Sequence, residues 1–76
     1  EFLIICPGTD EAGVVSLTDN IRQCVEAYDF SKPKNMTVSF GATTYQKGDS
    51  VSSIIKRCDE ALYAAKDTGR NKVVYR

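Results

Sequence analysis

The spacing of apolar residues changes repeatedly along this chain, and this pattern constrains its fold more than any other feature. Residues 2–6 form a short continuous apolar run, which is typical of a strand buried on both faces. Apolar residues recur at three- and four-residue steps over 11–28 and again over 51–68, as in amphipathic helices. Residues 36–43 alternate, as in a strand with one apolar face, and 72–75 form a short final strand or an edge ribbon. The predicted order is strand, helix, strand, helix, strand, an α/β sandwich with helices over a sheet.

Each predicted helix has a start signal and an apolar stripe. Thr9 or Asp10 can cap the first helix, and Ser50 or Asp49 the second. The stripe of the first helix consists of Val14, Leu17, Thr18, Ile21, Val25 and Tyr28. The stripe of the second helix consists of Val51, Ile54, Ile55, Cys58, Leu62 and Ala65. Both stripes are expected to pack on the sheet.

Two glycines mark positions where the backbone has special requirements. Gly41 interrupts the alternating strand, where a missing side chain indicates a bulge or a tight crossing of two backbones, or else the close approach of a nucleotide. Gly69 follows the second helix and is well placed as the left-handed residue that ends it.

Size and charge exclude several classes of protein. A chain of 76 residues with 42% hydrophobic content can form one small core. Such a chain buries only about 60% of its unfolded surface and is marginally stable by itself. Ten basic and ten acidic residues cancel, without a run of like charge, so no surface for nucleic acid or an anionic membrane is predicted. No apolar run approaches the roughly 18 residues of a membrane span, and the start lacks the basic region of a signal peptide.

The cysteines predict no metal site. Cys6, Cys24 and Cys58 are widely spaced, and the chain contains no histidine, which disfavours zinc. Each cysteine lies on or beside an apolar stripe. We expect buried free thiols in a reducing cytosol.

Two cations lie together at the end of the second helix. On a helix wheel Asp59, Tyr63 and Lys66 fall within about 60° of one another, and Arg70 follows just past Gly69. Lys supplies a point charge and Arg a planar fork of donors, so the pair suits a phosphate. Cations in this position also offset the negative end of the helix dipole in many proteins. On the residues alone, a phosphate site and a simple helix cap both remain possible.

Three blocks of the sequence resemble the GGDEF domain, the family of diguanylate cyclases that make cyclic di-GMP from two GTP. The first block is Glu1-Phe2-Leu3-Ile4-Ile5, which matches the last two letters of the Gly-Gly-Asp-Glu-Phe motif running into its strand. The second is Thr37-Val38-Ser39-Phe40-Gly41-Ala42, similar to a T-V-S-x-G-[VA] strand. The third is Ala61-Leu62-Tyr63-Ala64-Ala65-Lys66 followed by Gly69-Arg70-Asn71, similar to A-L-Y-x-A-K-x-x-G-R-N. The blocks follow the family's order and cover the whole chain.

The resemblance implies that residues 1–76 are the C-terminal portion of one GGDEF domain. The fold class would be a partial ferredoxin-like, nucleotidyl-cyclase-like α+β sandwich that lacks the N-terminal half of the domain. A strand from that half would lie between the strand at 2–6 and the strand at 36–42, leaving a slot. We therefore expect the fragment to need the N-terminal half, or a swapped copy of itself, in order to fold, and to be inactive alone.

The resemblance also implies a site for phosphoryl transfer. Lys66 and Arg70 match the positions that hold the triphosphate of GTP. Glu1 matches the fourth letter of the motif, beside the acidic third position that binds Mg²⁺, and is a catalytic candidate. The Mg²⁺ ligands would lie mostly upstream of this chain. Asp59 and Tyr63 also fall on motif positions, where structural roles are expected.

The implied partners are GTP and a second GGDEF domain, because catalysis needs two domains that face each other in a homodimer. The implied location is the cytoplasm, in a parent protein that is either soluble or tethered to a membrane by other segments. The alternative is a degenerate GGDEF module that binds GTP or a partner protein without catalysis. A standalone protein with a structural role is disfavoured, because the chain begins inside a motif. The residues just before Glu1 would distinguish the cyclase from the degenerate module.

Overall fold

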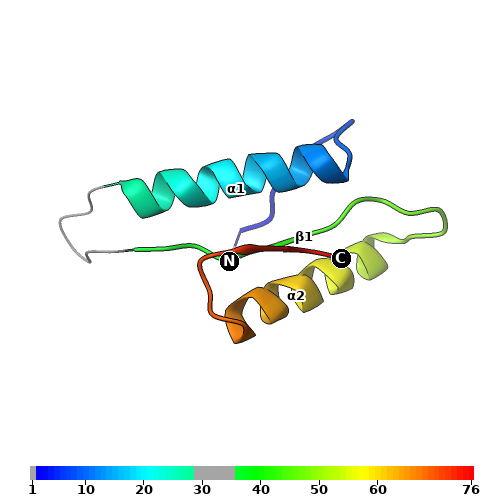
Figure 1. The fold of residues 1–76 in the computed structure, drawn as a ribbon. Coiled ribbons are helices and arrows are strands. Elements are labelled where there is room, and N and C mark those ends of the chain that lie inside the picture. The colour runs from blue at the N-terminus through cyan, green and yellow to red at the C-terminus, as the bar shows by residue number, and fades with distance from the viewer. Residues whose placement is uncertain (1, 29–35) are drawn as a thin grey trace.

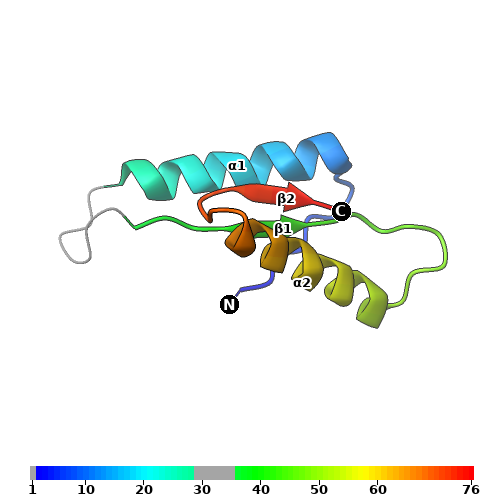
Figure 2. The ribbon, with the colours of Figure 1, turned by 60° about the horizontal axis from the view of Figure 1, so that its bottom comes forward.

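The computed structural model describes residues 2–28 and 36–76, which form two helices and a two-stranded sheet (Figure 1). The elements in chain order are α1 (Glu11–Ala27), β1 (Phe40–Ala42), α2 (Val51–Asp67) and β2 (Val73–Tyr75). β1 and β2 are parallel, with Phe40 opposite Val73. α1 and α2 lie on opposite faces of this sheet, and Figure 2 shows the two strands side by side between them. The predicted α/β sandwich is therefore confirmed as a small mixed α/β fold.

α1 begins and ends within a residue of its predicted bounds. The Asp10 carboxylate accepts a hydrogen bond from the main-chain N–H of Gly13 at 2.8 Å, which makes Asp10 the N-cap. Thr18 is buried, and its hydroxyl donates to the Val14 carbonyl at 2.7 Å, so the polar group has a partner inside the stripe.

Two residues of the predicted α1 stripe lie outside the core. Leu17 is 40% exposed and Tyr28 is 66% exposed. Both are exposed because the two-stranded sheet is too narrow to cover the full length and width of a helix of 17 residues.

α2 begins at the capping box formed by Ser50 and Ser53. The Ser50 hydroxyl accepts from the Ser53 N–H at 3.1 Å, and the Ser53 hydroxyl accepts from the Ser50 N–H at 2.9 Å. This reciprocal pair satisfies two donors that a helix start leaves without partners. Of the two predicted caps, Ser50 is confirmed, and Asp49 has a different role that is described below.

The buried face of α2 agrees only in part with the predicted stripe. Ala61 and Ala65 are fully buried, whereas Val51 is 74% exposed and Ile55 is 41% exposed. Ala65 belongs to the predicted stripe, and the stripe residues Ile54, Cys58 and Leu62 are half-buried, whereas Ala61 was not predicted. The prediction was wrong for Val51 and Ile55, because Val51 is the first residue of the helix and the burial of Ala61 shows that the buried face is turned away from Ile55.

Gly41 allows β1 and α2 to pack closely. A Cβ on Gly41 would overlap the main-chain nitrogen of Leu62 and the carbonyl oxygen of Cys58, and it would lie 2.8 Å from Leu62 Cα. The β1 backbone thus touches the α2 backbone directly. Of the alternatives for Gly41, the tight crossing of two backbones is confirmed.

The predicted strand at residues 2–6 is absent. Phe2 is fully exposed, and Leu3, Ile4 and Ile5 are all more than half exposed. A strand is defined by its pairing partner, and no described segment pairs with this run. The predicted strand at 36–43 is likewise shorter, at Phe40–Ala42, since only these residues have β2 as a neighbour. The predicted slot between residues 2–6 and β1 stays a prediction.

Candidate functional site

The carbonyl groups of Ala64, Ala65 and Thr68, at the C-terminal end of α2, have hydrogen-bond partners. The main-chain N–H and the hydroxyl of Thr68 both donate to the Ala64 carbonyl, at 3.0 and 2.6 Å. The main-chain N–H of Arg70 donates to the Ala65 carbonyl at 2.9 Å, the bond that defines a Schellman turn. The Lys72 ammonium donates to the Thr68 carbonyl at 2.5 Å. The helix end is therefore capped by main chain, a hydroxyl and Lys72, and these bonds do not involve the Arg70 side chain.

The turn after α2 contains three successive residues with positive φ: 122° at Gly69, 62° at Arg70 and 50° at Asn71. Gly has no Cβ and adopts such angles freely, and Asn tolerates them better than most residues. Arg is disfavoured there by about 1–2 kcal/mol. The prediction that Gly69 ends the helix with positive φ is confirmed, and Arg70 has a backbone conformation that its own residue type does not favour.

Lys66 and Arg70 lie at the same end of α2. Lys66 is in the last helical turn and Arg70 is two residues past the C-cap, and both are exposed. Asp59 and Tyr63 line a different surface, a shallow hollow of about 890 Å³ along the exposed side of α2. Neither Lys66 nor Arg70 is among the residues that line this hollow. Asp59, Tyr63 and Lys66, which the helix wheel places together, therefore lie on two surfaces: Asp59 and Tyr63 line the hollow, and Lys66 lies outside it.

Asn71 connects the turn to α1. Its Oδ1 accepts from Arg22 Nη1 at 3.1 Å, and its Nδ2 donates to Glu26 Oε2 at 2.6 Å. Its main-chain N–H donates to the Ser39 hydroxyl at 3.0 Å. Arg22 also pairs with Asp19 at 2.7 Å, and this bond lowers the pKa of the Asp19 carboxyl. The residue that follows Arg70 is thus bonded to the helix on the other face of the sheet.

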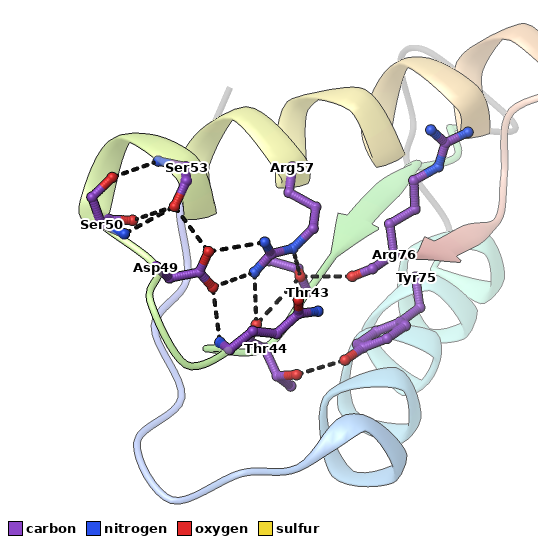
Figure 3. A network of polar contacts seen from close by, with 9 residues as sticks. Thr43, Thr44, Asp49, Ser50, Ser53, Arg57, Tyr75 and Arg76 are labelled. Atoms are coloured by element: carbon purple, nitrogen blue, oxygen red, sulfur yellow. Dashed lines mark hydrogen bonds and ion pairs between the residues drawn. The ribbon is translucent and has the colours of Figure 1, made fainter.

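A second polar network joins the β1–α2 connection to α2 (Figure 3). The Arg57 guanidinium pairs with both carboxylate oxygens of Asp49, at 3.1 Å from Nη1 and 2.6 Å from Nη2. Arg57 also donates to the Thr43 hydroxyl at 2.6 Å and to the Thr44 carbonyl at 2.9 Å. The hydrogen bonds from Arg57 hold the pKa of Asp49 far below its usual range. The Asp49 side chain is 8% exposed, so this ion pair is shielded from solvent.

The same network reaches the end of β2. The Thr43 hydroxyl donates to the Arg76 carbonyl at 2.6 Å, and the Thr44 and Tyr75 hydroxyls share a hydrogen bond of 2.5 Å. Figure 3 shows these groups around the Arg57 guanidinium. Sequence reasoning named Asp49 only as a helix cap and missed its pairing with Arg57. The available signal was an arginine inside an otherwise apolar side of a helix, one residue before Cys58.

Comparison with known proteins identifies the family. A family model described as Diguanylate cyclase, GGDEF domain, matches residues 1–72. The chain belongs to the GGDEF family. Diguanylate cyclase DgcM of Escherichia coli (strain K12) is 36% identical over 74 residues, which are 97% of this chain and 18% of DgcM. Diguanylate cyclase A of Treponema denticola is 36% identical over 78 residues, 96% of this chain and 21% of the relative. The response regulator PleD of Caulobacter vibrioides is 36% identical over 80 residues, 97% and 18% respectively.

The chain therefore spans about a fifth of the length of these relatives. The predicted resemblance to GGDEF domains is confirmed, and the two helices and two parallel strands are consistent with part of an α+β GGDEF fold. Glu1 lies outside the described residues, so its catalytic role stays a prediction. The phosphate-binding roles of Lys66 and Arg70 also stay predictions.

The GGDEF family generally uses Mg²⁺ and GTP, and its members dimerise. Within residues 2–28 and 36–76, no three His, Cys, Asp or Glu side chains are grouped so that they could hold a metal ion. None of the helices in the described ranges is long and apolar enough to cross a membrane.

All three cysteines are free, as predicted. Cys58 is half-buried against β1, and burial raises the pKa of its thiol. Cys24 is exposed, so the prediction of three buried thiols was wrong. It lies beside the α1 stripe rather than within it, on a part of the helix that the narrow sheet leaves uncovered.

Proposed function

We propose that the intact protein is a diguanylate cyclase, and that this chain supplies the cations that hold the triphosphate of GTP. Lys66 and Arg70 are the proposed contacts, at the C-terminal end of α2. The proposed partner is a second GGDEF domain with its own GTP, in the cytoplasm. Glu1 is proposed to help shape the metal-binding part of the site, together with residues upstream of it.

The backbone of Arg70 is the observation that supports this proposal most. An arginine with φ of 62° is disfavoured, and a glycine or asparagine at this position would relieve the penalty. Such strain is found mainly where a side chain is needed for function. The capping bonds at the Ala64, Ala65 and Thr68 carbonyls come from Thr68, the Arg70 main chain and the Lys72 ammonium, so none of these three caps uses the arginine side chain.

The chemistry requires charge neutralisation more than covalent catalysis. In each half-reaction the 3′-hydroxyl of one GTP attacks the α-phosphorus of the other, a new P–O bond forms, and the bond to pyrophosphate breaks. Two such steps give cyclic di-GMP and two pyrophosphates. Negative charge accumulates on the leaving pyrophosphate, where a point charge from Lys66 and a fork of donors from Arg70 would stabilise it.

The test measures synthesis of cyclic di-GMP by the full-length protein with GTP and Mg²⁺. Lys66→Ala and Arg70→Ala should each lower turnover by about 10²-fold or more, since each removes a charge-assisted contact to phosphate. Arg70→Lys should recover part of the loss, because it restores the charge but not the fork. Lys47→Ala is the matched control: it removes one exposed cation from the turn at the other end of α2 and should leave turnover unchanged.

Two results would contradict the proposal. Near-normal turnover with both Lys66→Ala and Arg70→Ala would leave only the helix-cap interpretation. A wild-type protein that binds GTP in an Arg70-dependent way but forms no product would instead be the degenerate GGDEF module.

A further inference from the structure

We infer that Asn71, held by Arg22 and Glu26 of α1, is a positioning residue for Arg70. This inference rests on the proposed function of Arg70. The inferred contact crosses the sheet. α1, on one face, holds the turn that follows α2, on the other face, and this turn carries Arg70.

The turn needs such a device because its backbone is held in an unfavourable conformation. Gly69, Arg70 and Asn71 all have positive φ, and a short segment of this kind relaxes unless its surroundings fix it. The main chain is fixed on one side by the bond from Arg70 N–H to the Ala65 carbonyl. On the other side it is fixed through Asn71, whose main-chain N–H donates to Ser39. Arg70 lies between these two attachments.

Both polar atoms of the Asn71 side-chain amide form hydrogen bonds with residues of α1. Oδ1 accepts from Arg22 at 3.1 Å and Nδ2 donates to Glu26 at 2.6 Å, so the plane of the amide is fixed by two partners. Arg22 is only 17% exposed and is itself held by Asp19 at 2.7 Å. Arg22 and Glu26 also approach each other at 3.5 Å, which closes a ring of three side chains. The Asn71 clamp, defined as Asn71 with Arg22 and Glu26, thus rests on a preformed charge pair.

Asparagine suits this position for two separate reasons. It tolerates the φ of 50° that the turn requires, and it offers one acceptor and one donor to partners of opposite charge. Glycine would satisfy the backbone but not the clamp. Aspartate would keep the acceptor toward Arg22 and lose the donor toward Glu26, placing two carboxylates against each other.

The first test separates positioning from general stability by a double-mutant cycle on GTP turnover in the full-length protein. Asn71→Gly keeps the left-handed backbone and removes the clamp, and it should lower kcat/KM for GTP by about tenfold to a hundredfold, as expected when a binding group is misplaced by about 1 Å. In an Arg70→Ala background the same change should have no further effect, because the group being positioned is gone. A purely structural role predicts equal losses in both backgrounds, and that result would overturn the inference.

The second test is a rescue. Asn71→Asp should lower kcat/KM, and adding Glu26→Gln should restore most of it, because the new pair exchanges donor and acceptor across the same contact. Gln23→Ala is the control, since it deletes the hydrogen bond of 2.7 Å from Gln23 to Asp19 without touching the turn, and it should leave kcat/KM unchanged. Failure of the double variant to recover activity, with folding intact by circular dichroism, would also overturn the inference.

The two proposals fail in different ways. If Arg70→Ala leaves GTP turnover unchanged, the proposed function of Arg70 is wrong and the role of Asn71 falls with it. If Arg70→Ala abolishes turnover while Asn71→Gly behaves like the wild type, only the positioning role is wrong.

Discussion

Gly41→Ala should be among the most damaging single-methyl substitutions in this domain. The new Cβ would overlap the Leu62 nitrogen and the Cys58 oxygen and would lie 2.8 Å from Leu62 Cα. All three are main-chain atoms in the middle of α2, so no change of side-chain rotamer can relieve the overlap and the helix must move. Overpacking costs about 1–3 kcal/mol when side chains can adjust. We expect about 3 kcal/mol or more here, a large part of a typical domain stability of about 5–15 kcal/mol.

The assay is urea unfolding of the intact protein, with Gly48→Ala as a matched control. Gly48 has φ of +92° and no atom within 4 Å of an added Cβ, so its substitution introduces backbone strain without overlap. That strain should cost only about 1–2 kcal/mol. The Gly41 variant should therefore have the lower urea midpoint of the two. Equal midpoints, or a Gly41 variant as stable as the wild type, would show that β1 does not pack on the α2 backbone.

Three further substitutions test other parts of the fold. Gly69→Ala should destabilise by about 1–2 kcal/mol through its φ of 122° alone, since the nearest atom to a new Cβ is Lys72 Nζ at 3.7 Å; an unchanged urea midpoint would contradict the left-handed helix end. Leu62→Ala should cost about 2 kcal/mol, the lower end of the usual range, because Leu62 is half-buried; no change would place Leu62 outside the core. Asp49→Asn should destabilise at pH 7, and the advantage of the wild type should shrink as pH falls below about 4. The folded-state pKa of Asp49 is depressed, so its stabilisation is present above the unfolded pKa and is lost as pH falls toward the folded one. An advantage that stays constant down to about pH 2 would contradict the Arg57 pair.

The helices could be predicted from sequence because their signals are local. Asp10 and Ser50 cap the helix starts through hydrogen bonds to residues three positions away, and Gly69 ends α2 within the same turn. The strands depend on distant partners, so apolar content alone overstated them at residues 2–6. An apolar run predicts a buried strand only if another strand lies next to it, and this information is not in the run itself.

The buried face of α2 shows a different limit. Val51 and Ile55 were placed in the stripe and are exposed, whereas the smaller Ala61 was left out and is fully buried, so apolar size alone does not decide burial here. The absence of a side chain at Gly41 lets the β1 backbone meet the α2 backbone at Cys58 and Leu62. Gly41 and Leu62 are far apart in sequence, and neither one alone predicts the contact. The glycine signal was recognised in the sequence, but its partner became evident only in three dimensions.

The sequence alone left two interpretations of Arg70 open, because a cation past a helix end can cap the helix or bind a phosphate. The structure adds the hydrogen-bond partners of the residues around Arg70. Lys72 reaches back to the Thr68 carbonyl, so this carbonyl is capped by a residue that lies beyond the signature. Asn71 reaches α1 through partners 45 and 49 residues away, which no local pattern could indicate. Within the signature, Gly69 allows the turn and Asn71 anchors it to α1. Neither task requires the side chain of Arg70. The proposed phosphate-binding role would account for a strained, exposed arginine between two structural neighbours, because its planar fork of donors suits a negatively charged phosphate.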